Sequence, residues 1–177
     1  RDPFEQVVKI VDAHGGASTF EYDETHGLSV KATNASGHGI ERKLDARGRV
    51  VAVVGPDGAT SRLEYDARDL VVRLTDPSGG SWTWSYDLAW QLAEESRPDG
   101  SVTRYAWNGG LLVAAEGAGG RRTVVEYDAR KMPRVFHGPQ GPVIELEHDA
   151  LGSVVRARTP RGAVRRMRWD NEGRLTE

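Results

Sequence analysis

The sequence predicts an all-β protein of about sixteen short antiparallel strands that follow one another in a single, strongly curled sheet. Three observations predict this fold: a motif that recurs about every 21 residues, two tight turns in each copy, and a strict alternation of polar and apolar residues ahead of the motif. The curl is expected because strands twist, and a flat open sheet of that width is not stable.

The repeat is anchored by the dipeptide Tyr-Asp or a degenerate form of it. Eight anchors follow one another at intervals of 20 to 22 residues. Their first residues are Tyr22, Leu44, Tyr65, Tyr86, Trp107, Tyr127, His148 and Trp169. Their second residues are Asp23, Asp45, Asp66, Asp87, Asn108, Asp128, Asp149 and Asp170. A fixed period of this length indicates a repeat architecture, in which each copy packs on its neighbours.

A glycine seven residues before every anchor marks the first turn of each copy. These turn glycines are Gly15, Gly37, Gly58, Gly79, Gly100, Gly120, Gly141 and Gly162. In five copies a proline stands two residues before the glycine, as in residues 56–58. Proline presets the φ angle at the second position of a turn and glycine accepts a positive φ, so the pair predicts a tight turn.

A second turn follows the anchor, where the anchor Asp can accept hydrogen bonds from backbone amides two residues further on. Several copies close this turn with glycine, as in residues 45–48. In four copies another residue replaces that glycine: Asp69, Trp90, Leu111 and Lys131. A positive φ disfavours these residue types, so we expect their turns to be strained or differently shaped.

The segment that leads into each anchor alternates. Two residues before the anchor the side chain is apolar in seven of eight copies, and Arg42 is the exception. One residue before the anchor it is polar in seven of eight. This period of two predicts a strand with one apolar face, on which stacked copies form an aromatic and aliphatic ladder. A propeller blade takes about 40 residues, and the copies show no super-period of that length.

Length and composition fit a single tandem-repeat segment over residues 1–177. The chain has no cysteine, which excludes disulfide scaffolds and thiolate sites, and its net charge of −2 argues against a general nucleic-acid binder. Its longest apolar runs have five residues, whereas a membrane helix needs about 20. The chain starts at Arg1 with no signal-like segment, so we expect a piece of a longer protein.

The repeat resembles the YD repeats of the Rhs family. The resemblance rests on the spacing Gly-x(6)-Tyr-Asp-x-x-Gly with an upstream Pro-Asp-Gly, clearest in residues 55–87, and it extends from about Val11 to Glu177. It implies an arc of a hollow β-shell that encloses a toxic C-terminal domain, as in Rhs effectors of type VI secretion and in Tc toxins. Related repeats occur in wall-associated proteins and teneurins.

The resemblance also implies partners and a location. The partners would be the remaining repeats of the same shell, an enclosed toxin domain and components of a secretion machine. The protein would be cytoplasmic before delivery and then secreted or delivered to a target cell. Shells of the family end in a self-cleaving segment similar to Asp-Pro-x-Gly-Leu. Residues 76–80 are the nearest string, but they lack the leucine and sit at an ordinary turn, so we expect no cleavage there.

No residue pattern marks a catalytic, cofactor or metal site. The five histidines have no metal-ligand spacing, and His148 stands at an anchor. Neither a nucleophile elbow nor a phosphate-binding loop is present. The aspartates recur once per copy beside an aromatic residue, which favours turn capping over calcium binding. We therefore expect a protein that is not an enzyme and needs no cofactor.

An aromatic cluster is the candidate contact patch: Trp82, Trp84, Trp90, Tyr105 and Trp107. It is interpreted either as a thick part of the ladder or as a stacking surface for sugars or an enclosed polypeptide. The alternative function is therefore an extracellular adhesion or carbohydrate-binding module that uses this patch. Charge is also uneven: residues 150–177 carry +4 and residues 1–149 carry −6. The basic end is either a solvated face or a contact for an acidic partner.

Overall fold

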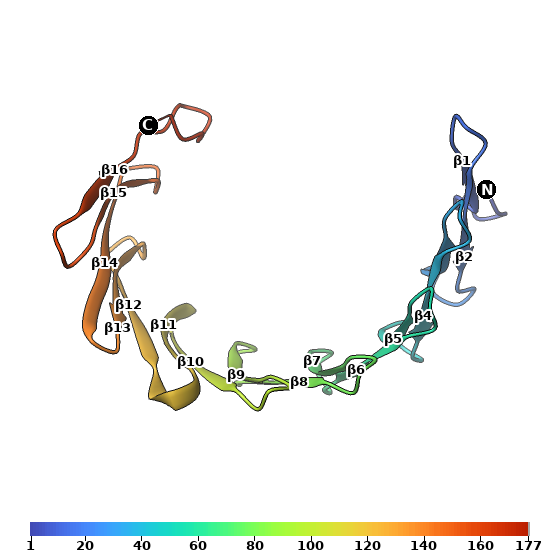
Figure 1. The fold of residues 1–177 in the computed structure, drawn as a ribbon, viewed down its shortest axis with the longest axis horizontal. Helices are drawn as coiled ribbons and strands as arrows, with labels where there is room; N and C mark the ends of the chain where they lie inside the picture. Colours follow the sequence, from blue (N-terminus) through green and yellow to red (C-terminus); the bar gives the residue numbers. More distant parts are fainter. Residues whose placement is uncertain (177) are drawn as a thin grey trace. The chain divides into compact units, whose positions relative to one another are not determined.

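The computed structural model describes residues 1–176 as a 16-stranded antiparallel sheet in which the strand order follows the chain order (Figure 1). The all-β prediction is therefore confirmed, with one short 3₁₀ turn at Ala118–Gly120. Among the described residues, no helix has the length and apolar character needed to cross a membrane.

The chain divides into two compact units, Arg1–Trp84 and Ser85–Glu177, and the boundary falls within β8. The strands up to the boundary are β1 (Lys9–Val11), β2 (Ala17–Tyr22), β3 (Ser29–Thr33), β4 (Gly39–Leu44), β5 (Val50–Val54), β6 (Thr60–Tyr65), β7 (Val71–Thr75) and β8 (Ser81–Tyr86). The second unit continues with β9 (Leu92–Ser96), β10 (Val102–Asn108), β11 (Leu111–Glu116), β12 (Arg122–Tyr127), β13 (Pro133–Gly138), β14 (Gly141–His148), β15 (Val154–Arg158) and β16 (Val164–Arg166).

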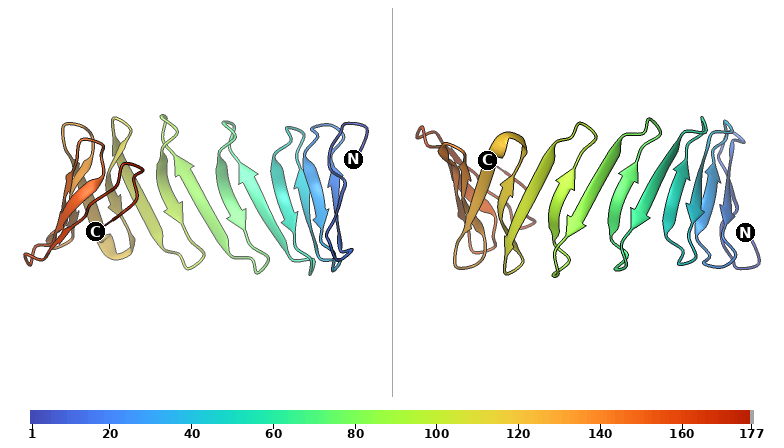
Figure 2. Two further views of the ribbon diagram at one scale, coloured as in Figure 1. Left: turned by 90° about the horizontal axis from the view of Figure 1, so that it is seen from above. Right: turned by 90° about the horizontal axis from the view of Figure 1, so that it is seen from below.

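Within each unit the strands lie side by side, joined by tight turns (Figure 2). The expected curl of the whole sheet stays a prediction, and so does the description of residues 1–177 as one repeat segment.

The anchor strands alternate as the sequence predicts. In β2 and β6 every second side chain is half-buried, up to and including the anchor tyrosine, and the residues between are exposed. Apolar residues meet directly across the strands on that face: Phe20 lies opposite Ala32, and Leu63 lies opposite Leu74. Such pairs contribute about 0.2–1 kcal/mol each.

The sheet is a single layer with almost no buried core. Within residues 1–176 only Ala52, Ala114 and Val135 are buried hydrophobic residues. Ala52 lies between Lys43 and Arg62 of the neighbouring strands, whose aliphatic stems can cover its methyl group. Stability must therefore come from contacts between neighbouring strands and turns, as in other repeat arrays.

The face opposite the ladder carries ion pairs between residues that lie directly across from each other. These pairs are Glu21–Lys31 (3.2 Å), Glu64–Arg73 (3.7 Å), Glu94–Arg104 (2.9 Å) and Glu147–Arg156 (2.7 Å). Exposed pairs of this kind contribute about 0–1 kcal/mol each. We call this surface the charged face.

Candidate functional site: the repeat anchors and their turns

Five of the aromatic anchors each donate a hydrogen bond to a backbone carbonyl 15 residues earlier in the chain. The bonds are Tyr22 to Val7 (2.9 Å), Tyr65 to Val50 (2.7 Å), Trp107 to Leu92 (2.8 Å), Tyr127 to Leu112 (2.8 Å) and Trp169 to Val154 (2.8 Å). The tyrosine hydroxyl and the indole N–H are both donors at the tip of a large, flat side chain. The two residue types can therefore replace each other at this position.

The accepting carbonyl lies beside a β-bulge where two copies meet. Between β4 and β5, Lys43 pairs with Ala52 and Leu44 pairs with Val50, so Val51 is an extra residue. A bulge disrupts the backbone ladder locally. The hydroxyl of Tyr65 donates to the Val50 carbonyl at this point, so the anchor of one copy holds the junction at the previous anchor.

The copy anchored by Leu44 is built differently. Leu44 has no donor, and the equivalent carbonyl, that of Ser29, accepts a hydrogen bond from the Arg42 guanidinium at 3.0 Å. Arg42 stands two residues before the anchor, where every other copy is apolar. Because residues two apart share a face of a strand, the arginine reaches the place that a tyrosine hydroxyl would occupy. Arg42 thus supplies the donor that Leu44 lacks.

The anchor carboxylates cap their turns. Asp45 Oδ1 accepts the backbone N–H groups of Arg47 (2.9 Å) and Arg49 (3.0 Å). The same bonds, two and four residues on, recur at Asp66, Asp87, Asp128, Asp149 and Asp170. Asp23 heads a longer loop and accepts the backbone N–H of His26 at 2.7 Å.

Hydrogen bonds favour the ionised form of Asp45 and Asp170. The Arg49 side chain lowers the pKa of Asp45 to about 2. The pKa of Asp170 is lowered most by a hydrogen bond from the backbone N–H of Arg174 and next by one from the Arg174 side chain. A charged acceptor strengthens each capping bond.

The turns before the anchors are built on the same plan. Asp12, Asn34 and Asp76 accept backbone N–H groups two and four residues on, a role that the sequence pattern alone does not predict. All eight predicted turn glycines have a positive φ, between 69° and 108°. A Cβ at any of the eight would meet nothing within 4 Å. Backbone conformation, and not space, therefore demands glycine there.

The four turns without the closing glycine divide as the sequence predicts. Asp69, Trp90 and Lys131 adopt φ values of 65°, 67° and 64°, so these turns keep the common shape with a strained residue. Around Leu111 the turn is different. Asn108 pairs directly with Leu111, and the two glycines between them both have positive φ, as a two-residue hairpin requires.

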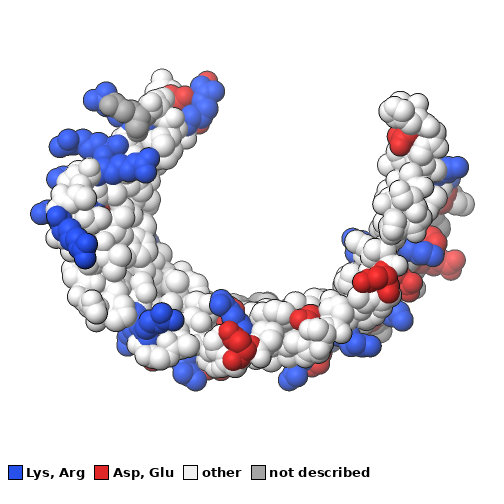
Figure 3. Space-filling model, in the orientation of Figure 1, with Lys and Arg blue, Asp and Glu red and all other residues white. Residues whose placement is uncertain are grey.

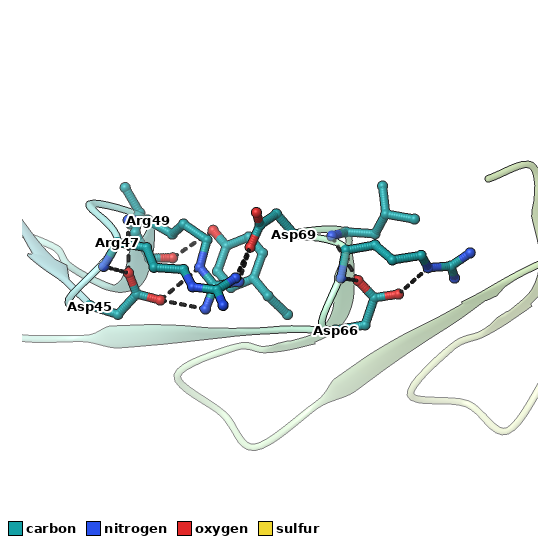
Figure 4. Close-up of polar contacts among 9 residues, drawn as sticks. Asp45, Arg47, Arg49, Asp66 and Asp69 are labelled. Carbon is teal, nitrogen blue, oxygen red and sulfur yellow. Dashed lines mark hydrogen bonds and ion pairs between the residues drawn. The ribbon is translucent and has the colours of Figure 1, made fainter.

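The strained Asp69 is the centre of a charge cluster in the first unit (Figure 4). Its carboxylate pairs with Arg47 at 3.0 Å and with Arg49, which also pairs with Asp45 at 2.6 Å. The Arg49 guanidinium lies 4.6 Å from the centre of the Tyr65 ring. We call Asp45, Arg47, Arg49, Tyr65 and Asp69 the inter-repeat clamp, because they join the anchor turns of two successive copies.

The structure adds a ninth anchor turn at the N-terminus. Asp2 Oδ1 accepts the backbone N–H groups of Phe4 and Gln6, each at 2.9 Å, and Glu5 has a φ of 64°. Asp2 lies one full period before Asp23. The spacing alone could have revealed this turn. It was missed because Arg1, and not an aromatic residue, precedes the aspartate.

The residues of the candidate contact patch are spread over both units. Trp82 and Trp84 are half-buried in β8, Trp82 lying opposite Leu74. Tyr105 and Trp107 share one face of β10, and Trp90 lies in a turn with 58% of its surface exposed. The patch remains a prediction. Within the described part of the chain, no three potential metal-ligating side chains come together.

Comparisons with known proteins agree with this architecture. The RHS Repeat family model matches residues 45–81 and 65–100. The chain also resembles solved structures of TcdB2-TccC3-TEV (15% identity, TM-score 0.73, 96% of this chain) and TcdB2-TccC3-Cdc42 (14%, 0.71, 91%). A structure of a Tc holotoxin pore from Photorhabdus luminescens is 14% identical, with a TM-score of 0.71 over 91% of this chain.

In each case the match spans 11% of the other chain, and identities this low establish the fold alone. No curated protein gives a significant sequence match. The RHS Repeat model thus matches residues 45–100, and the recurring motif extends the resemblance to the Rhs, or YD-repeat, family along the rest of the chain.

Proposed function

We propose that the chain is a non-enzymatic structural segment of an Rhs-type β-shell that encloses or carries a C-terminal toxin domain for delivery. The observation that carries the proposal is the use of the anchor side chains. Five of them donate to the preceding hairpin, and the anchor carboxylates cap the turns. The polar groups that recur in each copy thus hold the turns in shape and join neighbouring copies.

A single-layer sheet of this kind is suited to be a wall. It has almost no core of its own among the described residues, and each strand is supported by its neighbours. Such a layer can be lengthened copy by copy to bound a volume. The likeness in fold to chains of Tc toxin complexes supports this role. The partners would be further repeats, the enclosed toxin and parts of a delivery machine.

Limited proteolysis of the full-length gene product tests the proposal. We expect electron microscopy to show a hollow particle and proteinase K to spare a C-terminal domain until mild denaturant opens the wall. The same domain, expressed alone, is the control and should be digested at once. A particle without an internal volume, or equal digestion with and without the repeats, would overturn the proposal.

The alternative is an adhesion or carbohydrate-binding module, and one observation favours it. Trp90 is 58% exposed, and Leu88 in the same turn is 99% exposed. Exposed aromatic groups often mark contact surfaces. Titration with oligosaccharides, followed by tryptophan fluorescence, should show saturable binding that Trp90→Ala abolishes if this alternative is right. The shell proposal expects no such binding.

A further inference from the structure

An open apolar hollow lies on the ladder face of the first unit, within three interior strands. Phe20, Ala32 and Ile40 stand directly opposite one another on β2, β3 and β4. The next two copies have Val53 and Leu74 at the position of Ala32. Because the short alanine lies between two larger side chains, a hollow of about 410 Å³ remains, and all three residues line it.

A cation stands beside this hollow. Arg42 lines it and lies two residues after Ile40, on the same face of β4. Its Nη1 atom donates to the Ser29 carbonyl, but a guanidinium carries five N–H donors. Among the described residues no acidic side chain lines the hollow, and Arg42 pairs with no carboxylate. The positive charge thus borders an apolar floor without a counter-ion from its own chain.

Cations on the other side of the sheet are placed differently. In Figure 3 most charged side chains of the first unit gather on one side of the sheet, and few stand on the other. On the charged face Lys31 lies 3.2 Å from Glu21, and Arg73 lies 3.7 Å from Glu64. Arg42 stands away from these pairs. A partner that brought a carboxylate to the hollow would therefore meet no acid already in place.

The shape of the hollow favours a side chain of a polypeptide over a free small molecule. Pockets for small ligands usually bury most of the surface of the ligand. A hollow on a single-layer sheet covers its occupant from one side, and Ile40 at its rim is 47% exposed. A side chain that the rest of a polypeptide already holds in place loses less freedom when it enters such a site.

We propose that this hollow docks an aromatic side chain of a partner polypeptide, while a neighbouring carboxylate of the same partner binds Arg42. The ring fills the space above Ala32 and packs against Phe20, as aromatic pairs do in offset or edge-to-face contact. The Asp or Glu of the partner accepts N–H groups of Arg42 that Ser29 does not use, and such charge-assisted bonds are strong. Docking here does not depend on an enclosed toxin.

Saturation-transfer NMR tests the proposal, because it detects weak binding of a peptide to a dilute protein. The probe is the peptide Gly-Ser-Phe-Asp-Ser-Gly, added to the 177-residue chain. We expect saturable binding, with the strongest transfer to the Phe ring. A matched peptide with Asn in place of Asp should bind about tenfold more weakly, since the ion pair is lost. A peptide with Ala in place of Phe should not bind.

Substitutions in the chain locate the site. Ala32→Leu fills the hollow with the residue type found at Leu74 and should abolish binding without changing the circular dichroism spectrum. Ala32→Val, the residue type of Val53, is the milder filling if leucine disturbs the strand. Arg42→Gln keeps an amide donor for the Ser29 carbonyl and should reduce the affinity for the Asp peptide to that for the Asn peptide.

Two matched controls should leave binding unchanged. Lys43→Gln removes the next cation along β4, which lies on the charged face, and Ala157→Leu makes the same filling at the equivalent position of β15. Equal binding of the Asp and Asn peptides would reveal apolar adhesion only and would overturn the proposal. Binding that survives in folded Ala32→Leu or Ala32→Val, or no saturable binding to the wild-type chain, would overturn it as well.

Discussion

A donor at the tip of a long side chain is what the anchor position requires. Tyr65 and Trp107 differ in shape and chemistry, yet each places one polar hydrogen on a carbonyl of the preceding hairpin. A half-buried carbonyl that accepts no hydrogen bond lowers the stability of the fold by about 1–3 kcal/mol. The Leu44 copy meets the same requirement through Arg42, so the position is defined by the carbonyl and not by the aromatic ring.

A second substitution should therefore rescue the loss of the Arg42 donor. Arg42→Leu removes the donor to Ser29 and should lower the free energy of unfolding by about 1 kcal/mol. Adding Leu44→Tyr supplies a hydroxyl at the usual anchor position and should restore most of the loss. Urea unfolding followed by circular dichroism measures both. Arg62→Leu, on the charged face of β6, is the control and should cost little; no rescue in the double variant would contradict the shared role.

The strand-and-turn pattern could be predicted from the sequence, but the bonds between copies could not. Alternation around Leu63 and the Pro-x-Gly turns are local signals, so the strands and turns followed from them. The bond from Tyr65 to Val50 depends on the bulge between β4 and β5, which no local pattern reveals. Asp69 looked like a misfit in its own turn, and only the structure places Arg47 and Arg49 of the previous copy beside it.

At the scale of the turn, the anchor carboxylate has two roles that can be separated: it caps the turn and it forms an ion pair. Asp45 caps its turn through backbone bonds and also pairs with Arg49. Asn34 heads a turn with the same two backbone bonds, at 3.0 Å each, although it carries no charge. An amide therefore suffices for the turn, and the charge serves the link between copies.

Asp45→Asn should accordingly weaken the clamp and leave the turn intact. The pKa of Asp45 is lowered to about 2, against an ordinary value of about 3.9. A lowered pKa contributes stability that is present above pH 4 and is lost as the pH falls toward 2. We expect wild type to be the more stable protein at pH 7 and the difference in free energy of unfolding to shrink steadily as the pH falls from 4 toward 2.

Urea unfolding at pH 7, 4 and 2.5 checks this dependence. Asp57→Asn is the control, because Asp57 caps a turn through the Ala59 amide and pairs with no cation in the structure described for residues 1–176. The difference in free energy of unfolding between wild type and Asp57→Asn should not shrink with falling pH as it does for Asp45→Asn. A constant gap between wild type and Asp45→Asn across the range would show that the ion pairs of the clamp contribute nothing.

At the scale of the molecule, a sheet whose described residues form almost no core depends on having neighbours on both sides of every strand. Interior strands have them, but β1 and β16 each have one partner strand. In β1, Phe20 donates to Val8 and Asp12 donates to Gly16, so the backbone of Lys9 and Val11 faces outward. Ile10 and Val11 are 54% and 57% exposed, and Lys9 is the only charge in the strand. Such an edge invites pairing with another chain.

We therefore expect the isolated chain to self-associate through this edge. Sedimentation velocity should show species larger than a monomer as the concentration rises toward about 100 μM. Val11→Pro removes an outward N–H without removing a bond to β2, so it should leave a monomer with an unchanged circular dichroism spectrum. Ile10→Pro is the matched control: its N–H faces Ser18, so the same substitution should destabilise the hairpin itself. A wild-type chain that stays monomeric throughout, with Val11→Pro making no difference, would show that the edge is already protected.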